Sequence, residues 1–67
     1  MWRYNKEEIE CIENLLEHEY TVIEHITQYK QNGKMVDEFL VKSNETSAIK
    51  ILTINHDGDI VEEYAVP

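Results

Sequence analysis

The chain has 67 residues, with 14 Asp and Glu against 6 Lys and Arg, and its formal charge is −8. This length allows one small domain and excludes a dinucleotide-binding fold, a barrel enzyme or a kinase lobe. A hydrophobic content of 42% is too high for a disordered tail, so we expect a compact globule that is only marginally stable without a partner.

Cysteine content and hydropathy indicate the compartment. Cys11 is the only cysteine, so it cannot form the internal disulfides on which most secreted domains of this size depend. No apolar run approaches 18 residues, and no apolar stretch follows the basic residues near the amino terminus, which argues against a membrane span and a signal peptide. We therefore expect a cytoplasmic protein in which Cys11 is a partly buried structural thiol.

The first predicted element is a helix that begins after Asn5. Asn5 is a favourable N-cap residue, and Glu8 stands where the second member of a capping box is expected. Tyr4 and Ile9 have the spacing of a hydrophobic staple across the same helix start. The pattern predicts a helix from residue 6 to about residue 17 or 18.

This helix is amphipathic. At about 100° per residue, the apolar side chains share a stripe roughly 120° wide, formed by Ile9, Ile12, Leu15 and Leu16. The opposite side is acidic and carries Glu7, Glu10, Glu13 and Glu17. We expect the apolar stripe to pack on a sheet and the glutamates to lie in solvent.

After residue 20 the sequence is rich in β-branched and aromatic residues, which favours strands. Asn32-Gly33 and Asp57-Gly58 are strong signals for two-residue type I′ hairpin turns, and a loop is expected at residues 43–47. The predicted strands are residues 20–31, 34–42, 48–56 and 59–66. The fold class is therefore α+β, with one N-terminal helix followed by a four-stranded antiparallel β-meander.

A two-residue turn at Asn32-Gly33 sets the register of the first hairpin. The face expected to receive the helix carries, with Tyr20 and Val22, the pairs Lys30–Met35, Ile26–Phe39 and Glu24–Val41. The other face carries Ile23, Tyr29, Val36 and Leu40. The alternative is a β-bulge in the first strand, because strict alternation fails near Ile23 and Ile26, and a bulge would reassign these faces.

In the second hairpin, the Asp57-Gly58 turn predicts Ile51–Tyr64 and Ile49–Val66 on one face and Ile54–Val61 on the other. Both hairpins are then apolar on two sides, whereas one helix covers only one side of a sheet. The uncovered face predicts a homodimer contact or a partner surface, formed by Tyr29, Val36, Leu40 and Ile54.

Most of the negative charge lies in and just after the predicted helix. Residues 7–19 contain six Glu and no Lys or Arg. Like charges at i,i+4, such as Glu13 and Glu17, destabilise a helix by about 0.2–0.5 kcal/mol, and acids near its carboxyl end oppose the helix dipole. A departure from local preferences without a compensating gain is typical of a functional surface.

Carboxylates spaced about 4.5–6 Å along a helix resemble a phosphate backbone to any basic groove. The sequence therefore favours a small inhibitor or regulator that occupies the basic site of a nucleic-acid-binding protein. Small acidic helix-plus-sheet inhibitors occur in phages and mobile elements, a likeness of size and charge only. The candidate partner-binding residues are Glu7, Glu10, Glu13, Glu17, Asp57, Asp59 and Glu62, with Glu24 as a further candidate.

Two alternatives remain open at this point. The acids can serve solubility alone, or the chain can be a structural homodimer that uses the uncovered sheet face. Direct nucleic-acid binding is disfavoured, because the net charge repels phosphates and the Lys and Arg residues form no run.

Enzymatic and metal chemistry lack their motifs. Both glycines fall in hairpin turns, which leaves none for a phosphate-binding loop. His18-Glu19 begins like a zinc-protease motif, but Val22 stands where the second His is required. His25 and His56 are isolated in predicted strands and are expected to be cross-strand or surface residues. We therefore expect no catalytic residue, no metal and no cofactor.

Overall fold

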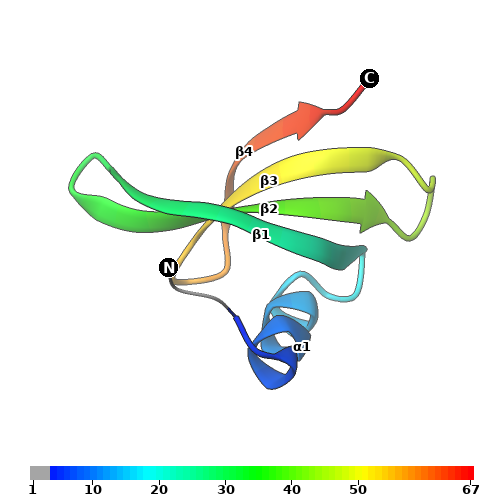
Figure 1. Cartoon of the computed structure of the whole chain (residues 1–67), viewed down its shortest axis with the longest axis horizontal. Coiled ribbons are helices and arrows are strands. Elements are labelled where there is room, and N and C mark those ends of the chain that lie inside the picture. The colour runs from blue at the N-terminus through cyan, green and yellow to red at the C-terminus, as the bar shows by residue number, and fades with distance from the viewer. Residues whose placement is uncertain (1–3) are drawn as a thin grey trace.

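The computed structural model describes residues 4–67. The expected absence of a signal peptide rests on the first six residues, so it lies partly outside the described residues. One helix precedes four strands, which form a single antiparallel sheet in the order β1-β2-β3-β4. The elements are α1 (Lys6–Leu15), β1 (Tyr20–Gln31), β2 (Lys34–Ser43), β3 (Ile49–Asn55) and β4 (Ile60–Ala65). The predicted α+β meander is confirmed, and Figure 1 shows α1 beneath one face of the sheet.

The helix begins as predicted and ends early. The Asn5 side chain accepts a hydrogen bond from the Glu8 N–H (2.8 Å), and the Glu8 carboxylate accepts one from the Asn5 N–H (3.1 Å), which completes the capping box. The predicted continuation to residue 17 or 18 is wrong, because α1 ends at Leu15. Glu17 and His18 both have φ of 57°, and a right-handed helix cannot continue through this left-handed backbone.

The first hairpin has the predicted turn. Asn32 and Gly33 have φ values of 53° and 80°, as a type I′ turn requires. Lys30 pairs with Met35 as expected. The turn chemistry therefore fixes the pairing of the strand ends next to it.

Further along β1, the predicted pairing is wrong, and the bulge alternative is confirmed. The register shifts past Ile23 and again past Ile26, because each of these is an extra residue of β1 that no residue of β2 opposes. A one-residue shift turns the following side chains to the other face. The pairs are His25–Phe39 and Val22–Val41 in place of the predicted Ile26–Phe39 and Glu24–Val41.

The β3–β4 turn also differs from the prediction. It is a three-residue loop, His56–Gly58, closed by a hydrogen bond from the Asn55 N–H to the Asp59 carbonyl (3.0 Å). Within this loop only Gly58 has a positive φ, of 86°, so the turn is not type I′. The Asn55 side chain accepts hydrogen bonds from the Asp57 and Asp59 N–H groups (2.9 and 3.0 Å) and stabilises this longer loop.

A bulge near the start of β4 follows from this loop. Ile54 faces Ile60 instead of the predicted Val61. Beyond the bulge the predicted pair Ile51–Tyr64 is present. The extra loop residue and the bulge offset each other, which restores the expected register over the rest of β4.

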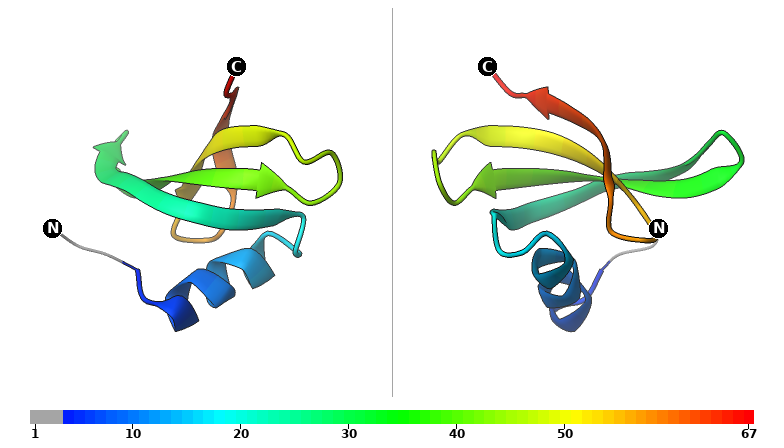
Figure 2. Two further views of the ribbon diagram at one scale, coloured as in Figure 1. Left: turned by 45° about the vertical axis from the view of Figure 1, so that its right-hand side comes forward. Right: turned by 180° about the vertical axis from the view of Figure 1, so that it is seen from behind.

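The core lies between α1 and one face of the sheet, which we call the helix face (Figure 2). Ile12 and Leu16 of the helix segment pack there on four buried sheet residues, Phe39, Val41, Leu52 and Ile54. Ile54 was expected on the opposite face, and this prediction is wrong. Leu52 pairs with Phe39 across β2 and β3, so Ile54, two residues further along β3, shares the helix face.

The opposite face, which we call the outer face, has no helix over it. Val36 and Thr53 are nevertheless buried there, with 2% and 0% of their surface exposed. Gln31 of β1 donates to Glu62 of β4 across this face (2.5 Å), although two strands separate them. The sheet is therefore strongly twisted, as Figures 1 and 2 show. The prediction of an open apolar face is only partly correct, because Val36 is buried in the twisted sheet.

Candidate functional site

Two of the predicted acids lie on the solvent side of α1. Glu7 and Glu10 are exposed and stand on the side of the helix away from Ile12, which is buried against the sheet. They are about 4.5 Å apart along the helix axis, as three residues of α-helix require. Neither carboxylate forms an ion pair with any residue that the structure describes.

Glu13 is turned toward the sheet and is not part of a solvent-facing row. Its carboxylate accepts a hydrogen bond from the Val22 backbone N–H (2.8 Å) and is partly buried. This contact joins the helix to β1 and satisfies a backbone donor at the free edge of that strand. The predicted row of four solvent-facing helix glutamates is therefore wrong, because Glu13 has a structural partner and Glu17 lies beyond the helix end.

The β3–β4 turn brings two further predicted acids to the helix. A side-chain carbon added at Gly58 would lie 3.1 Å from the Leu15 Cβ, so the turn backbone is packed against the last residue of α1. Asp57 and Asp59 flank Gly58 and are exposed. Glu17, also exposed, follows Leu15 by two residues. Three acids distant in the sequence are thus gathered at the carboxyl end of the helix.

We call Glu7, Glu10, Glu17, Asp57 and Asp59 the acidic surface. All five are exposed, and in residues 4–67 none of them forms an ion pair. The surface consists of one side of a short helix and the turn packed against its end. It carries five of the formal negative charges of the chain, and no basic residue between positions 4 and 67 forms an ion pair with them.

Glu62 does not belong to the acidic surface. It lies on the outer face, where it accepts hydrogen bonds from Tyr64 and Gln31. These two donors lower the pKa of its carboxyl group, Tyr64 having the larger effect. Glu24, the further candidate, faces Leu40 on the same outer face. The structure therefore separates both residues from the helix acids.

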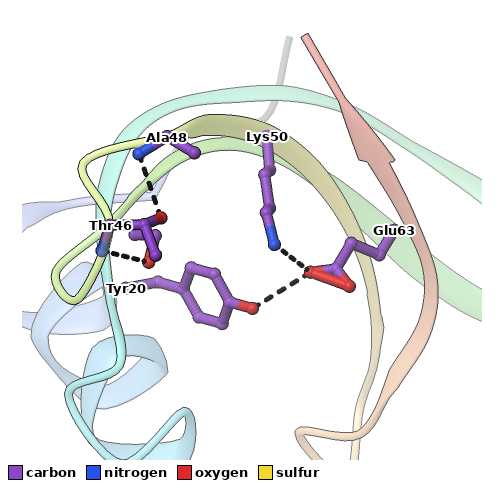
Figure 3. Close-up of polar contacts among 6 residues, drawn as sticks. Tyr20, Thr46, Ala48, Lys50 and Glu63 are labelled. Carbon is purple, nitrogen blue, oxygen red and sulfur yellow. Dashed lines mark hydrogen bonds and ion pairs between the residues drawn. The ribbon is translucent and has the colours of Figure 1, made fainter.

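Glu63 lies on the helix face and has a basic partner. Lys50 donates to its carboxylate at 3.1 Å and Tyr20 at 3.0 Å, and Figure 3 shows the three side chains converging beneath the curved sheet. The hydrogen bonds, first from Lys50 and then from Tyr20, lower the pKa of Glu63. This cluster joins the first strand to the last, so its role in the fold accounts for its charges.

A buried polar cluster that the sequence analysis missed lies on the helix face near the amino terminus. The Asp37 carboxylate, in a residue only 3% exposed, accepts hydrogen bonds from Tyr4 (2.8 Å) and Gln28 (3.0 Å). His25 Nε2 lies 3.0 Å from the same carboxylate. Burial, and then the bond to Asp37, raise the pKa of Tyr4. The strand period was the available signal, because Asp37 precedes Phe39 by two residues and must share its face.

The Asp37 cluster holds the amino-terminal segment on the sheet. The rings of Tyr4, His25 and Phe39 pack on one another with centroids 4.9–5.1 Å apart. Each donor of the cluster is directed at one buried carboxylate, and such satisfied networks favour a single arrangement. We assign the cluster a structural role.

Cys11 and His56 are the remaining reactive side chains that the sequence analysis considered. Cys11 is exposed, so the expected partial burial is wrong: one helical turn separates it from Leu15, which is itself 56% exposed. His56 is exposed in the β3–β4 loop. Among the described residues, no group of three or more His, Cys, Asp or Glu is placed to hold a metal ion. No helix in this part of the chain is long and apolar enough to cross a membrane.

Comparison with protein-family models, with curated proteins and with solved structures found no match for this chain.

Proposed function

We propose that the chain is a small intracellular binding module that uses its acidic surface to occupy a basic, nucleic-acid-binding site on a partner protein. The observation that carries this proposal is the set of five exposed acids that form no ion pair within residues 4–67, two of which the turn–helix contact brings to the end of the helix. A solubility role requires charge but not its concentration on one helix side and one adjoining turn.

The charge pattern of the rest of the molecule supports this choice of surface. Glu13, Glu62 and Glu63 each accept hydrogen bonds from the chain itself. The acidic surface has no such internal use, and bringing unpaired carboxylates together costs electrostatic free energy. A basic partner would recover that free energy and would be attracted at long range by the net charge of −8.

The fold holds this surface rigidly. The capping box fixes the first turn of α1, next to Glu7. The Asn55 side chain and the Leu15 contact fix the loop that carries Asp57 and Asp59. Because the backbone that carries these carboxylates is already ordered, binding would cost the chain little backbone conformational entropy.

The test is a comparison of two charge-neutralised variants as bait in a lysate of the native host. One variant carries Glu7→Gln, Glu10→Gln, Asp57→Asn and Asp59→Asn. The matched control carries Glu19→Gln, Glu24→Gln, Glu38→Gln and Glu45→Gln, which remove the same charge from residues outside the acidic surface. The first set leaves the Glu13–Val22 contact intact.

We expect the wild type and the control to retain a basic nucleic-acid-binding protein that duplex DNA or RNA displaces, and the acidic-surface variant to lose it. Rising salt should weaken the capture, mainly through a slower association rate. Equal capture by both variants, or a captured partner that nucleic acid does not displace, would remove the acidic surface from the mechanism.

A further inference from the structure

The outer edge of β4 is the feature that the acidic surface does not explain. In an antiparallel pair, residues alternate between those whose N–H and C=O face the neighbouring strand and those whose groups face away. The Val66 N–H donates to the Ile49 carbonyl (3.0 Å), so Tyr64 and Val66 face β3. Glu63 and Ala65 therefore direct their backbone groups outward, where no described strand follows.

The opposite edge of the sheet is closed to strand addition. On β1, the Glu13 carboxylate accepts the hydrogen bond of the Val22 N–H. Two bulges also interrupt that strand, past Ile23 and past Ile26. Bulges and blocked donors are the usual means by which proteins protect an edge strand. β4 has one bulge, near its start, but residues 63–66 lie beyond it and their edge is uninterrupted, so this part of β4 is the better pairing edge.

The acidic side chains of β4 do not block strand pairing at its edge. Charged side chains on an edge strand commonly prevent pairing, and β4 has two, Glu62 and Glu63. Gln31 holds Glu62 on the outer face, and Lys50 holds Glu63 on the helix face. Both carboxylates are thus drawn over the faces of their own sheet and away from the edge.

An apolar row crosses the outer face and ends at this edge. Leu40 pairs with Ile51, and Ile51 pairs with Tyr64. Tyr64 is 52% exposed, and Val66 beside it on the same face is 39% exposed. This row replaces the predicted dimer face, from which Val36 and Ile54 are removed by burial.

We infer that two copies of the chain join edge to edge, with β4 antiparallel to β4 about a twofold axis at Tyr64. In this register Tyr64 faces Tyr64 of the second copy in a non-hydrogen-bonded pair. The outward N–H and C=O groups of Glu63 then meet those of Ala65 of the second copy, and the symmetry repeats this pair on the other side. The apolar row becomes continuous across both sheets.

Charge excludes two of the neighbouring registers. An axis at Glu62 or Glu63 would place identical carboxylates directly opposite each other, which is destabilising. With the axis at Tyr64, Glu62 faces Val66 and Glu63 faces Ala65 of the second copy, so no acid opposes an acid. A second copy fits the edge because the contact requires no counter-charge, both acids of β4 being paired within their own chain.

Amide hydrogen exchange and sedimentation of the full chain, from low micromolar to millimolar concentration, test the pairing. We expect the sedimenting mass to double, and the amides of Glu63 and Ala65 to exchange about tenfold more slowly once nine-tenths of the chain is dimeric, because exchange then proceeds through the remaining monomer. The amides of Tyr64 and Val66, which face β3, should not change. A monomer at every concentration would overturn the inference.

Two variants test the register. Ala65→Pro removes an outward N–H that β3 does not use, and proline is tolerated at such edge positions. Tyr64→Lys places like charges across the axis while lowering the net negative charge of the chain. We expect both to be monomeric, the proline variant with unchanged thermal unfolding at low concentration, and the control Ala65→Ser to dimerise. A dimer that persists in both variants would refute pairing through β4.

Salt separates this inference from the proposed function. Screening weakens repulsion between two chains that each carry −8, so rising salt should favour the dimer, while it should weaken binding to a basic partner. The two salt responses are therefore independent, and failure of one does not refute the proposal that the other tests. If the chain stays monomeric and a lysine-rich peptide alone slows exchange at Glu63 and Ala65, the edge binds a peptide strand and not a second copy.

Discussion

Thr53 is the one buried residue of the described sheet whose polar atom has no partner. It is 0% exposed on the outer face, and its Oγ1 forms no hydrogen bond. The residue lies between Glu38 and Glu62 on the neighbouring strands. A buried hydroxyl without a partner costs about 1–3 kcal/mol relative to water. Thr53 therefore contributes to packing through the shape of its side chain and not through its hydroxyl group.

Thr53→Val should therefore raise the free energy of unfolding by about 1 kcal/mol, because valine keeps the shape and removes the unpaired hydroxyl. Urea denaturation measures the change. The matched control is Thr27→Val, an exposed position that faces Glu38 on β2, where we expect stability within about 0.5 kcal/mol of the wild type. Destabilisation by Thr53→Val would mean that the hydroxyl has a partner, such as water.

At the scale of elements, the contact between the β3–β4 turn and α1 depends on one glycine. Gly58 has φ of 86°, and an added Cβ would lie 3.1–3.3 Å from three carbon atoms of Leu15. Gly33 has a similar φ, 80°, but open space around the position of a Cβ. Substitution of Gly33 therefore measures the cost of backbone strain alone. Substitution of Gly58 measures that cost together with the cost of steric contact with Leu15.

Gly33→Ala should lower stability by about 1 kcal/mol, the usual cost of a left-handed residue with a Cβ. Gly58→Ala should lower it by about 2–3 kcal/mol, since the methyl group also pushes the turn away from the helix. Thermal and urea unfolding of the two variants measure the difference. Equal losses would show that the turn does not pack against Leu15, and the acidic surface would then lose its connection to the turn.

At the scale of the whole molecule, acids are present in two electrostatic states. Glu62 and Glu63 are stabilised as carboxylates by donors of the same chain, which lowers the pKa of each below the ordinary 4.5. Within residues 4–67 the acidic surface has no ion-pair partner. Protonation of Glu62 or Glu63 therefore removes a favourable interaction within the chain.

Glu63 should give the pH dependence a definite sign. A carboxyl group whose pKa is lower in the folded state contributes stability above its unfolded value and loses it as the pH falls through the folded value. We expect Glu63→Gln to lose less stability than the wild type between pH 7 and pH values below 4.5. Glu45→Gln, in the exposed 44–48 loop, is the control and should follow the wild type in thermal unfolding across this range.

The sequence by itself determined the fold class, the start of the helix and the first hairpin turn. Asn5 and Glu8 specify the helix start, and Asn32-Gly33 specifies the first hairpin, because capping boxes and type I′ turns are made by residues within a few positions of one another. Strand periodicity likewise contained the information that Asp37 lies on the buried face. Such signals are local, so they are readable without knowledge of distant contacts.

Only the tertiary structure decided which acids share a surface. Glu13 is withdrawn to β1, Glu62 and Glu63 are drawn to opposite faces of the sheet, and Gly58 brings Asp57 and Asp59 to the end of the helix. Each outcome depends on packing between residues far apart in the chain and on bulges whose single extra residue reverses a face. Spacing along the sequence determines the position of a charged side chain on its own helix or strand. The packing of the elements determines which groups of the folded chain that side chain contacts.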